Sequence, residues 1–226
     1  MKTFTFMENL SPIPDLERRQ DEQSGTRQYQ LPTGEWVPSV TTLLQYFKRG
    51  SLSRWRERVG EEEAKKISTS AARRGTKIHL MLERYLNNDP QYINEQSHPD
   101  EQQAFNDLLI HVDKIDNIRY SEAKLYSPKM KLAGQVDVIA EYDGKLSVID
   151  FKTSSKVKEE KYTKDYFLQA TAYALMHEDL TGVPIDNLVI LVWSMDGGAQ
   201  VFEKSKAEFM DELFDKIIRY HKENKS

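Results

Sequence analysis

The chain has 226 residues, of which 38% are hydrophobic and 30% are charged, and its formal net charge is −4. This composition is typical of a globular protein, and the absence of cysteine excludes disulfides, zinc–thiolate sites, iron–sulfur clusters and cysteine nucleophiles. Because no apolar run approaches the roughly 20 residues of a membrane span and the N-terminus lacks a signal-like apolar core, we expect a cytoplasmic protein.

Two local patterns open the chain. The first 26 residues are polar and interrupted by proline, so residues 1–26 are predicted to form a loose N-terminal arm. The segment that follows, residues 27–38, alternates around a Thr33-Gly34 turn and predicts a short hairpin. A helix is expected to open shortly after the hairpin, at Val40.

Two amphipathic helices are predicted next. The first runs from about Ser70 to Asn87, because its apolar residues recur at helical spacing and form one stripe. The stripe consists of Ile78, Met81, Leu82, Tyr85 and Leu86. The second helix runs from about Asp100 to Ile115. Beyond the second helix the hydrophobic period changes to two, which predicts strands near residues 120–126, 131–142 and 145–153.

The last part of the chain is predicted to hold two helices and two strands. A helix over about residues 163–179 precedes a buried strand in LVILVWSM and a short strand in AQVFEK. The final helix is expected to start at Ser205, whose spacing to Glu208 matches a capping box, and to bury Phe209, Leu213, Phe214 and Ile217. This order of elements predicts an α/β fold, with a central mixed β-sheet flanked by helices and an N-terminal helical and hairpin extension. Since no linker divides the chain, we expect one domain over residues 1–226.

The strongest chemical signal surrounds a tight hairpin with Asp143-Gly144 as its loop. These residues suit a type I′ turn, which needs φ > 0 at both central positions. Counting outward from this turn, Asp137 faces Asp150 in a non-hydrogen-bonded pair, where opposed Cα atoms come within about 4.5 Å. Two carboxylates are therefore expected side by side.

A lysine accompanies the two carboxylates. Lys152 is expected on the same side of the sheet, facing Gln135, because side chains alternate with period two. Like charges directly opposite each other destabilise a sheet, so we expect a cation between Asp137 and Asp150, and carboxylate oxygens favour Mg²⁺ or Mn²⁺. The alternative is an ordinary surface salt bridge on a solvent-facing strand; it is favoured for each residue alone, but not for three residues in register.

These residues resemble a known signature. Asp137 followed by Asp150-Phe151-Lys152 is similar to the motif of the PD-(D/E)xK nuclease superfamily. The helical segment GTKIHLMLERYL, which contains His79, resembles the histidine motif of the RecB-like branch of that superfamily.

Two further segments extend the resemblance. QATAY, with Gln169 and Tyr173, resembles the Q-x-x-x-Y motif of the RecB-like branch. Over about residues 28–176 the chain looks most like the subgroup of mitochondrial genome maintenance exonucleases and their phage relatives, which acts on single-stranded DNA ends. Glu122, in SEAKLY, lies where that subgroup has an acidic residue, so the resemblance implies that Glu122 is a catalytic residue.

The resemblance implies a metal-dependent DNA exonuclease. The expected ligands of Mg²⁺ or Mn²⁺ are His79, Asp137, Asp150 and the Phe151 carbonyl. Lys152 would orient or deprotonate the attacking water, and Gln169 would support the site. DNA would be held by Arg73, Arg74, Lys77, Lys156 and Tyr173, although for any single lysine a solvated face is the better explanation.

Two alternative functions stay open. A duplex-resecting recombination exonuclease would prefer duplex ends and commonly form rings, whereas a catalytically inactive DNA-binding module would bind DNA without cleaving it. The chain has no Gly-rich phosphate loop, so no motor is expected beside the nuclease. Recombination, repair and nucleotide salvage are all compatible with the sequence.

Overall fold

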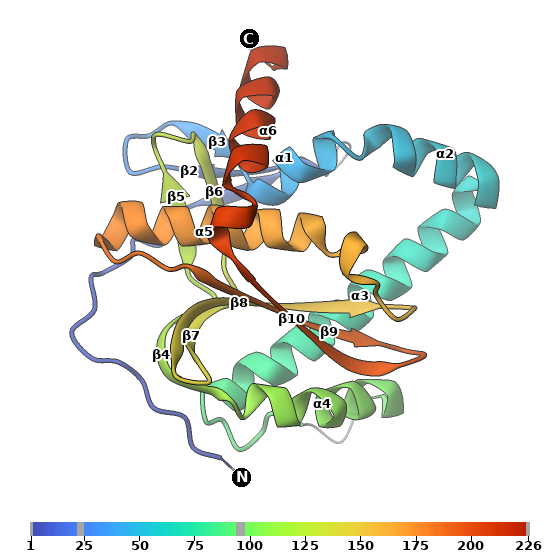
Figure 1. Cartoon of the computed structure of the whole chain (residues 1–226). Coiled ribbons are helices and arrows are strands. Elements are labelled where there is room, and N and C mark those ends of the chain that lie inside the picture. The colour runs from blue at the N-terminus through green and yellow to red at the C-terminus, as the bar shows by residue number, and fades with distance from the viewer. Residues whose placement is uncertain (1, 22–24, 94–97, 225–226) are drawn as a thin grey trace.

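The computed structural model describes residues 2–21, 25–93 and 98–224, and within them five strands form a central mixed sheet (Figure 1). The strand order is β10-β9-β8-β7-β4; β8 and β9 run parallel, and the other neighbours are antiparallel. The strands are β4 (Ile115–Ser121), β7 (Val138–Tyr142), β8 (Lys145–Ser154), β9 (Asn187–Ser194) and β10 (Gly198–Ser205).

Helices cover both faces of this sheet (Figure 1). On one face lie α3 (Glu61–Leu86) and α4 (Pro99–Val112), and on the other lies α5 (Lys164–Thr181), against which α6 (Met210–Glu223) packs. Burial on both faces explains why β9 reads as the continuous apolar run LVILVW rather than as an alternating one. The predicted α/β fold with a central mixed sheet between helices is confirmed.

The predicted hairpin belongs to a small antiparallel sheet in an N-terminal extension. β2 (Arg27–Gln30) lies in the middle of this sheet, between β1 (Arg18–Gln20) and β3 (Trp36–Pro38). Gly34 occupies the turn between β2 and β3 with a φ of 87°, a conformation that favours glycine.

Two helices complete the extension. α1 (Val40–Tyr46) starts after Ser39, whose side chain accepts a hydrogen bond from the Thr42 N–H, and it packs against α5 and α6. α2 (Arg49–Val59) was not foreseen from the sequence. Its sequence is strongly charged, and none of its residues, all of which the structure describes, is buried, so its short apolar spacing of Leu52, Trp55 and Val59 is not matched by packing against the core.

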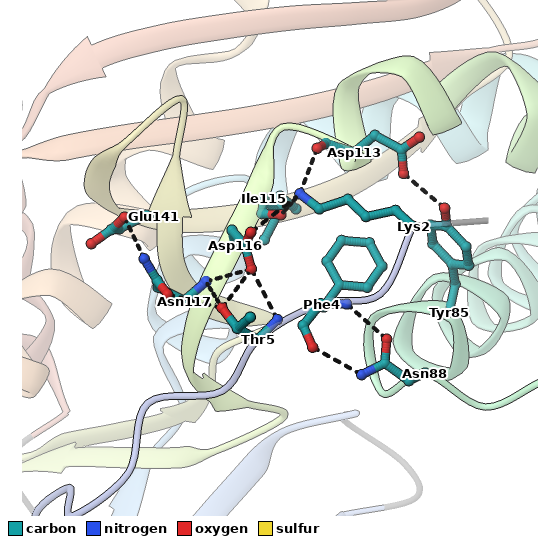
Figure 2. A network of polar contacts seen from close by, with 10 residues as sticks. All are labelled: Lys2, Phe4, Thr5, Tyr85, Asn88, Asp113, Ile115, Asp116, Asn117 and Glu141. Atoms are coloured by element: carbon teal, nitrogen blue, oxygen red, sulfur yellow. Dashed lines mark hydrogen bonds and ion pairs between the residues drawn. The ribbon is translucent and has the colours of Figure 1, made fainter.

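The N-terminal segment is docked on the domain, so the prediction of a loose arm is wrong for the described part of residues 1–26. Phe4 is buried, and its backbone exchanges two hydrogen bonds with the Asn88 side chain (Figure 2). The Ile118 N–H donates to the Thr5 carbonyl at 2.9 Å, which covers the edge of β4. Apolar side chains such as Phe4, dispersed among polar residues, anchor the segment; residues 1 and 22–24 lie outside the described part.

The strands between residues 120 and 153 differ from the prediction. Instead of three strands, the described structure has β5 (Lys124–Ser127) and β6 (Leu132–Gln135) between β4 and β7, paired as a separate two-stranded sheet. The chain leaves the central sheet at Glu122, whose φ is 52°, and returns after Asp137. The alternating pattern continues through both breaks, so it could not reveal them.

Two helix boundaries also differ. The helix predicted from Ser70 begins at Glu61, and its first turn carries three glutamates, which suit the positive end of the helix dipole. At the C-terminus, the capping box between Ser205 and Glu208 is present, but it heads a short 3₁₀ helix that precedes α6.

Among the described residues, no helix combines the length and the hydropathy that crossing a bilayer requires.

Burial along α6 follows the prediction with one exception. Leu213 and Ile217 are buried, and Phe209 is partly buried against the same core. Phe214 is 38% exposed, so its predicted burial is wrong. The face of α6 that meets α5 is narrower than the apolar stripe in the sequence.

Candidate active site

The hairpin that organises the site has the predicted turn and register. Asp143 and Gly144 have φ values of 47° and 76°, as a type I′ turn requires. The ladder between β7 and β8 ends at the pair Val138 and Ile149, one residue short of the expected pair of aspartates. Asp137 lies just beyond the ladder, and its Oδ2 accepts a hydrogen bond of 2.8 Å from the Phe151 N–H.

The expected pairing of Lys152 with Gln135 is wrong. Gln135 lies on β6, where it pairs with Lys124, because the chain has left the central sheet at this point. Its side-chain amide donates a 2.6 Å hydrogen bond to Oε2 of Glu122. Gln135 therefore supports a carboxylate of the site instead of facing the lysine.

Three side chains from distant elements converge at the end of β7. His79 projects from α3, Glu122 follows β4, and Asp137 precedes β7; one possible ligand atom from each lies within 4.8 Å of the others. Nδ1 of His79 is 3.6 Å from Oδ2 of Asp137. The backbone places the two acids together as well, since the Glu122 N–H donates to the Asp137 carbonyl at 2.9 Å.

The electrostatics of this cluster call for a cation. Burial, together with the negative charges of Asp137 and Glu83, raises the pKa of Glu122 to about 8. All three cluster members are only partly buried, so an ion could reach them from solvent. Two carboxylates and one imidazole are a donor set that suits a hard divalent ion.

Asp150 and Lys152 form an ion pair beside the cluster. Asp150 is fully buried and makes an ion pair with Nζ of Lys152. Burial raises the pKa of Asp150 to about 6 although Lys152 opposes the shift, and the charge of Asp137 adds to it. Burial alone would lower the pKa of Lys152, but the carboxylates of Asp150 and Asp137 raise it, which keeps the ammonium charged. Among the described residues, the three-residue metal-ligand cluster does not include Asp150.

Gln169 and Tyr173, the two motif residues of α5, extend the polar contacts of this pair. The side-chain amide of Gln169 donates to Oδ1 of Asp150 at 3.3 Å and to the Tyr173 hydroxyl at 3.1 Å. Tyr173 is 2% exposed, and its ring packs against Gly134. A chain of polar contacts thus runs from Tyr173 through Gln169 and Asp150 to Lys152.

A cavity of about 480 Å³ opens over these groups. This volume lies within the range of about 300–1,000 Å³ that is usual for ligand pockets. The predicted site residues that line it are His79, Glu122, Asp137, Lys152, Gln169 and Tyr173. Sequence reasoning missed the wall formed by the N-terminal extension, which consists of Arg27, Tyr29, Ser39 and Thr41. No local pattern signals these residues, because only the tertiary fold brings the extension to the site.

The basic residues predicted to hold DNA lie apart from this cavity. Arg73, Arg74 and Lys77 line a second cavity of about 240 Å³ between α3 and the start of α4. Lys77 makes an ion pair of 2.9 Å with Glu101, which neutralises part of its charge. Lys156 is exposed in the loop after β8.

Comparison with known proteins agrees with these features. Residues 104–224 match the family described as the PD-(D/E)XK nuclease superfamily. Mitochondrial genome maintenance exonuclease 1 of Mus musculus is 30% identical over 188 residues, which cover 78% of this chain and 54% of the relative. The Homo sapiens protein of the same name is 30% identical over 173 residues, covering 71% and 50%. The chain thus spans about half the length of the curated relatives it matches, and the resemblance predicted from its motifs is confirmed.

Proposed function

The chain belongs to the PD-(D/E)XK nuclease superfamily, and we propose that it is a divalent-metal-dependent deoxyribonuclease that removes nucleotides from DNA ends, preferably single-stranded ones. The observation that carries this proposal is the convergence of His79, Glu122 and Asp137 beside the charged Lys152 in one cavity. The exonuclease name of the relatives supports it, although the match covers only 54% and 50% of those two proteins. We further propose that residues 1–226 form one nuclease domain and that the protein is cytoplasmic.

The acid–histidine cluster fits a divalent ion. Burial and the negative charge of Asp137 raise the pKa of Glu122 to about 8, a cost that a bound cation would offset. His79, Glu122 and Asp137 would hold Mg²⁺ or Mn²⁺. When bound, such an ion stabilises negative charge on phosphate oxygens and eases deprotonation of an attacking water.

Two further groups are candidate ligands. The Phe151 N–H points at Asp137, and the N–H and C=O of one strand residue point to the same edge, so the Phe151 carbonyl is directed toward the cluster. Asp150 lies close enough to Asp137 for the charge of Asp137 to raise its pKa. We therefore keep both groups in the proposed ligand set.

Lys152 would act on the substrate directly. Its ammonium remains charged, is 20% exposed and lines the cavity, so it can approach the phosphate and the attacking water. A fixed positive charge at this position stabilises the charge that develops on the phosphate oxygens. Asp150, which itself accepts a hydrogen bond from Gln169, holds the lysine on one side and limits its conformational freedom.

The DNA strand would leave the cavity over basic side chains. Arg73, Arg74, Lys77 and Lys156 are the proposed contacts to the phosphate backbone, and Tyr173 would contribute from the cavity floor. The ion pair of Lys77 with Glu101 makes it the weakest of these contacts. Such contacts fix the strand without reading its sequence.

Digestion of labelled DNA tests the proposal. Linear and circular substrates, single- and double-stranded and labelled at either end, are incubated with Mg²⁺, Mn²⁺ or a chelator. We expect metal-dependent release of nucleotides from linear single strands, lost in Asp137→Asn. Hydrolysis that persists in chelator contradicts the proposal. Faster digestion of duplex ends would instead support a resecting exonuclease, and binding without cleavage would support an inactive module.

A further inference from the structure

Arg27 lines the active-site cavity, and hydrogen bonds hold its backbone in place. It lies on β2, the central strand of the N-terminal sheet, and lines the same cavity as the acid–histidine cluster. Its N–H donates to Oγ1 of Thr42 at 2.9 Å, and its carbonyl accepts from the Ser39 N–H at 2.9 Å and from Oγ1 of Thr42 at 3.1 Å. The start of this side chain is therefore fixed in place.

The Nε of the Arg27 guanidinium, by contrast, lacks an acceptor. This nitrogen is fully buried and has no hydrogen-bond partner, and no ion pair joins Arg27 to any residue that the structure describes. Lys152, the other Lys or Arg side chain on the described wall of this cavity, is already paired with Asp150. Buried polar groups almost always have partners, and an unpaired one costs stability, so the unpaired Nε–H of Arg27 points to a ligand.

The chemistry of the wall selects an anion with several oxygens. A guanidinium presents a planar fork of donors that matches phosphate in a bidentate manner. Thr41 lines the same wall, and its hydroxyl is 2.8 Å from Oγ of Ser39, which itself donates to Oγ1 of Thr42. The Thr41 hydroxyl would donate to a ligand by turning away from Ser39. The acidic cluster in the same cavity would repel a phosphate, so a phosphate needs a positively charged side chain such as Arg27 away from those acids.

We propose that Arg27, assisted by Thr41, binds a phosphate of the substrate strand next to the scissile one. This proposal rests on the proposed nuclease function and adds the element that fixes how far the strand end enters the cavity. Arg27 makes no ion pair with Glu122 or Asp137 in the described structure. The two carboxylates therefore do not neutralise the charge of Arg27, which can attract a phosphate.

Binding without metal tests the role of Arg27 separately from catalysis. Short single-stranded oligonucleotides with a 5′-phosphate, a 3′-phosphate or no terminal phosphate are titrated in EDTA at several salt concentrations. The variants are Arg27→Gln and, as a control for the loss of one charge in the same sheet, the exposed Arg18→Gln. We expect Arg27→Gln to bind about tenfold more weakly and to lower the salt slope by about one, with Arg18→Gln like wild type.

The three oligonucleotides identify which phosphate is bound. A loss confined to one phosphorylated end assigns Arg27 to a terminal phosphate, and an equal loss on all three assigns it to an internal one. Equal affinity and salt slope for Arg27→Gln and Arg18→Gln, while wild type cleaves DNA, overturn the proposal and leave the nuclease function intact. Wild-type protein that neither binds nor cleaves DNA overturns both.

Thermal unfolding tests whether Arg27 has a purely structural role. Because Nε of the Arg27 guanidinium has no partner among the described residues, removal of the guanidinium should leave the melting temperature unchanged or higher. A clearly lower melting temperature together with an unchanged salt slope would mean that Arg27 supports the fold, which overturns the proposal.

Discussion

The ring of Tyr173 lies directly against the backbone of Gly134, where a Cβ on the glycine would come 2.7 Å from Cε1 of the ring. Gly134 lies on β6 of the two-stranded sheet, and Tyr173 lies on α5. Since the ring is 2% exposed, it cannot simply swing into solvent to make room. The missing side chain thus lets α5 approach closely enough for Gln169 to reach Asp150.

Gly134→Ala should destabilise the protein and lower its activity. The added methyl group overpacks a buried contact, which costs about 1–3 kcal/mol, and the displaced ring loosens the hydrogen bond to Gln169. Urea denaturation and initial hydrolysis rates measure the two effects. Gly50→Ala is the matched control, because nothing lies within 4 Å of its added Cβ, and in a helix it should stabilise by about 0.5–1 kcal/mol. Equal stability of Gly134→Ala and wild type would contradict the close contact.

Glu122→Gln should separate metal binding from folding. At pH 7 the carboxyl of Glu122 is largely protonated in the metal-free protein, since its pKa is raised to about 8 by burial and by Asp137, so an amide is a close substitute. The metal-free melting temperature should therefore change little, while the stabilisation by added Mn²⁺ should shrink. Scanning calorimetry with and without Mn²⁺ measures both quantities. An undiminished effect of Mn²⁺ would exclude Glu122 as a ligand.

Lys152→Ala should reduce turnover without removing the metal. If the ammonium stabilises charge on the phosphate, kcat falls by about 10²–10³-fold, whereas the rise in melting temperature caused by Mn²⁺ persists. Single-turnover hydrolysis and the same calorimetric assay give the two numbers. Unchanged kcat would show that the lysine only balances the charge of Asp150.

The docking of the N-terminal segment should fail in acid. Asp116 accepts hydrogen bonds from the N–H and the hydroxyl of Thr5, and these contacts lower its pKa to about 2 (Figure 2). A lowered pKa means that the carboxylate stabilises docking fully above about pH 4 and loses this effect as the pH falls toward 2. Cleavage near Phe4 by an acid protease should accelerate over this window.

A variant and a peptide provide the controls for that experiment. Asp116→Asn should already be cleaved rapidly at pH 5, because the amide replaces a charged acceptor. An unstructured peptide with the same cleavage site corrects for the pH dependence of the protease. Cleavage of wild type at a constant corrected rate from pH 5 to 2 would show that Asp116 does not hold the segment.

The sequence predicted the parts of the site that depend on local rules. The Asp143-Gly144 turn fixes the register of β7 and β8 through backbone conformation alone, so the positions of Asp137 and Asp150 along the hairpin followed from counting. The helical spacing around Ile78 likewise placed His79 on a long helix. These features depend on residues that are close together in the chain.

Features that depend on tertiary contacts could not be predicted in this way. The position of Glu122 beside Asp137 depends on a left-handed residue and a break between β4 and β5, and neither interrupts the alternating pattern. Arg27 reaches the cavity only because the N-terminal sheet packs beside β6. Phe4 is buried whereas Phe6, two residues on, is 47% exposed, so hydrophobicity alone could not show which of the two is buried.

The direct test is the position of a bound ion. Crystals soaked in Mn²⁺ and measured for anomalous scattering should show a peak coordinated by His79, Glu122 and Asp137, with Lys152 remaining in the same cavity. Asp137→Asn crystals treated identically should lose or weaken this peak. Wild-type crystals with no anomalous peak at these three side chains, at a Mn²⁺ concentration that supports hydrolysis, would contradict a metal-dependent nuclease centred on this cluster.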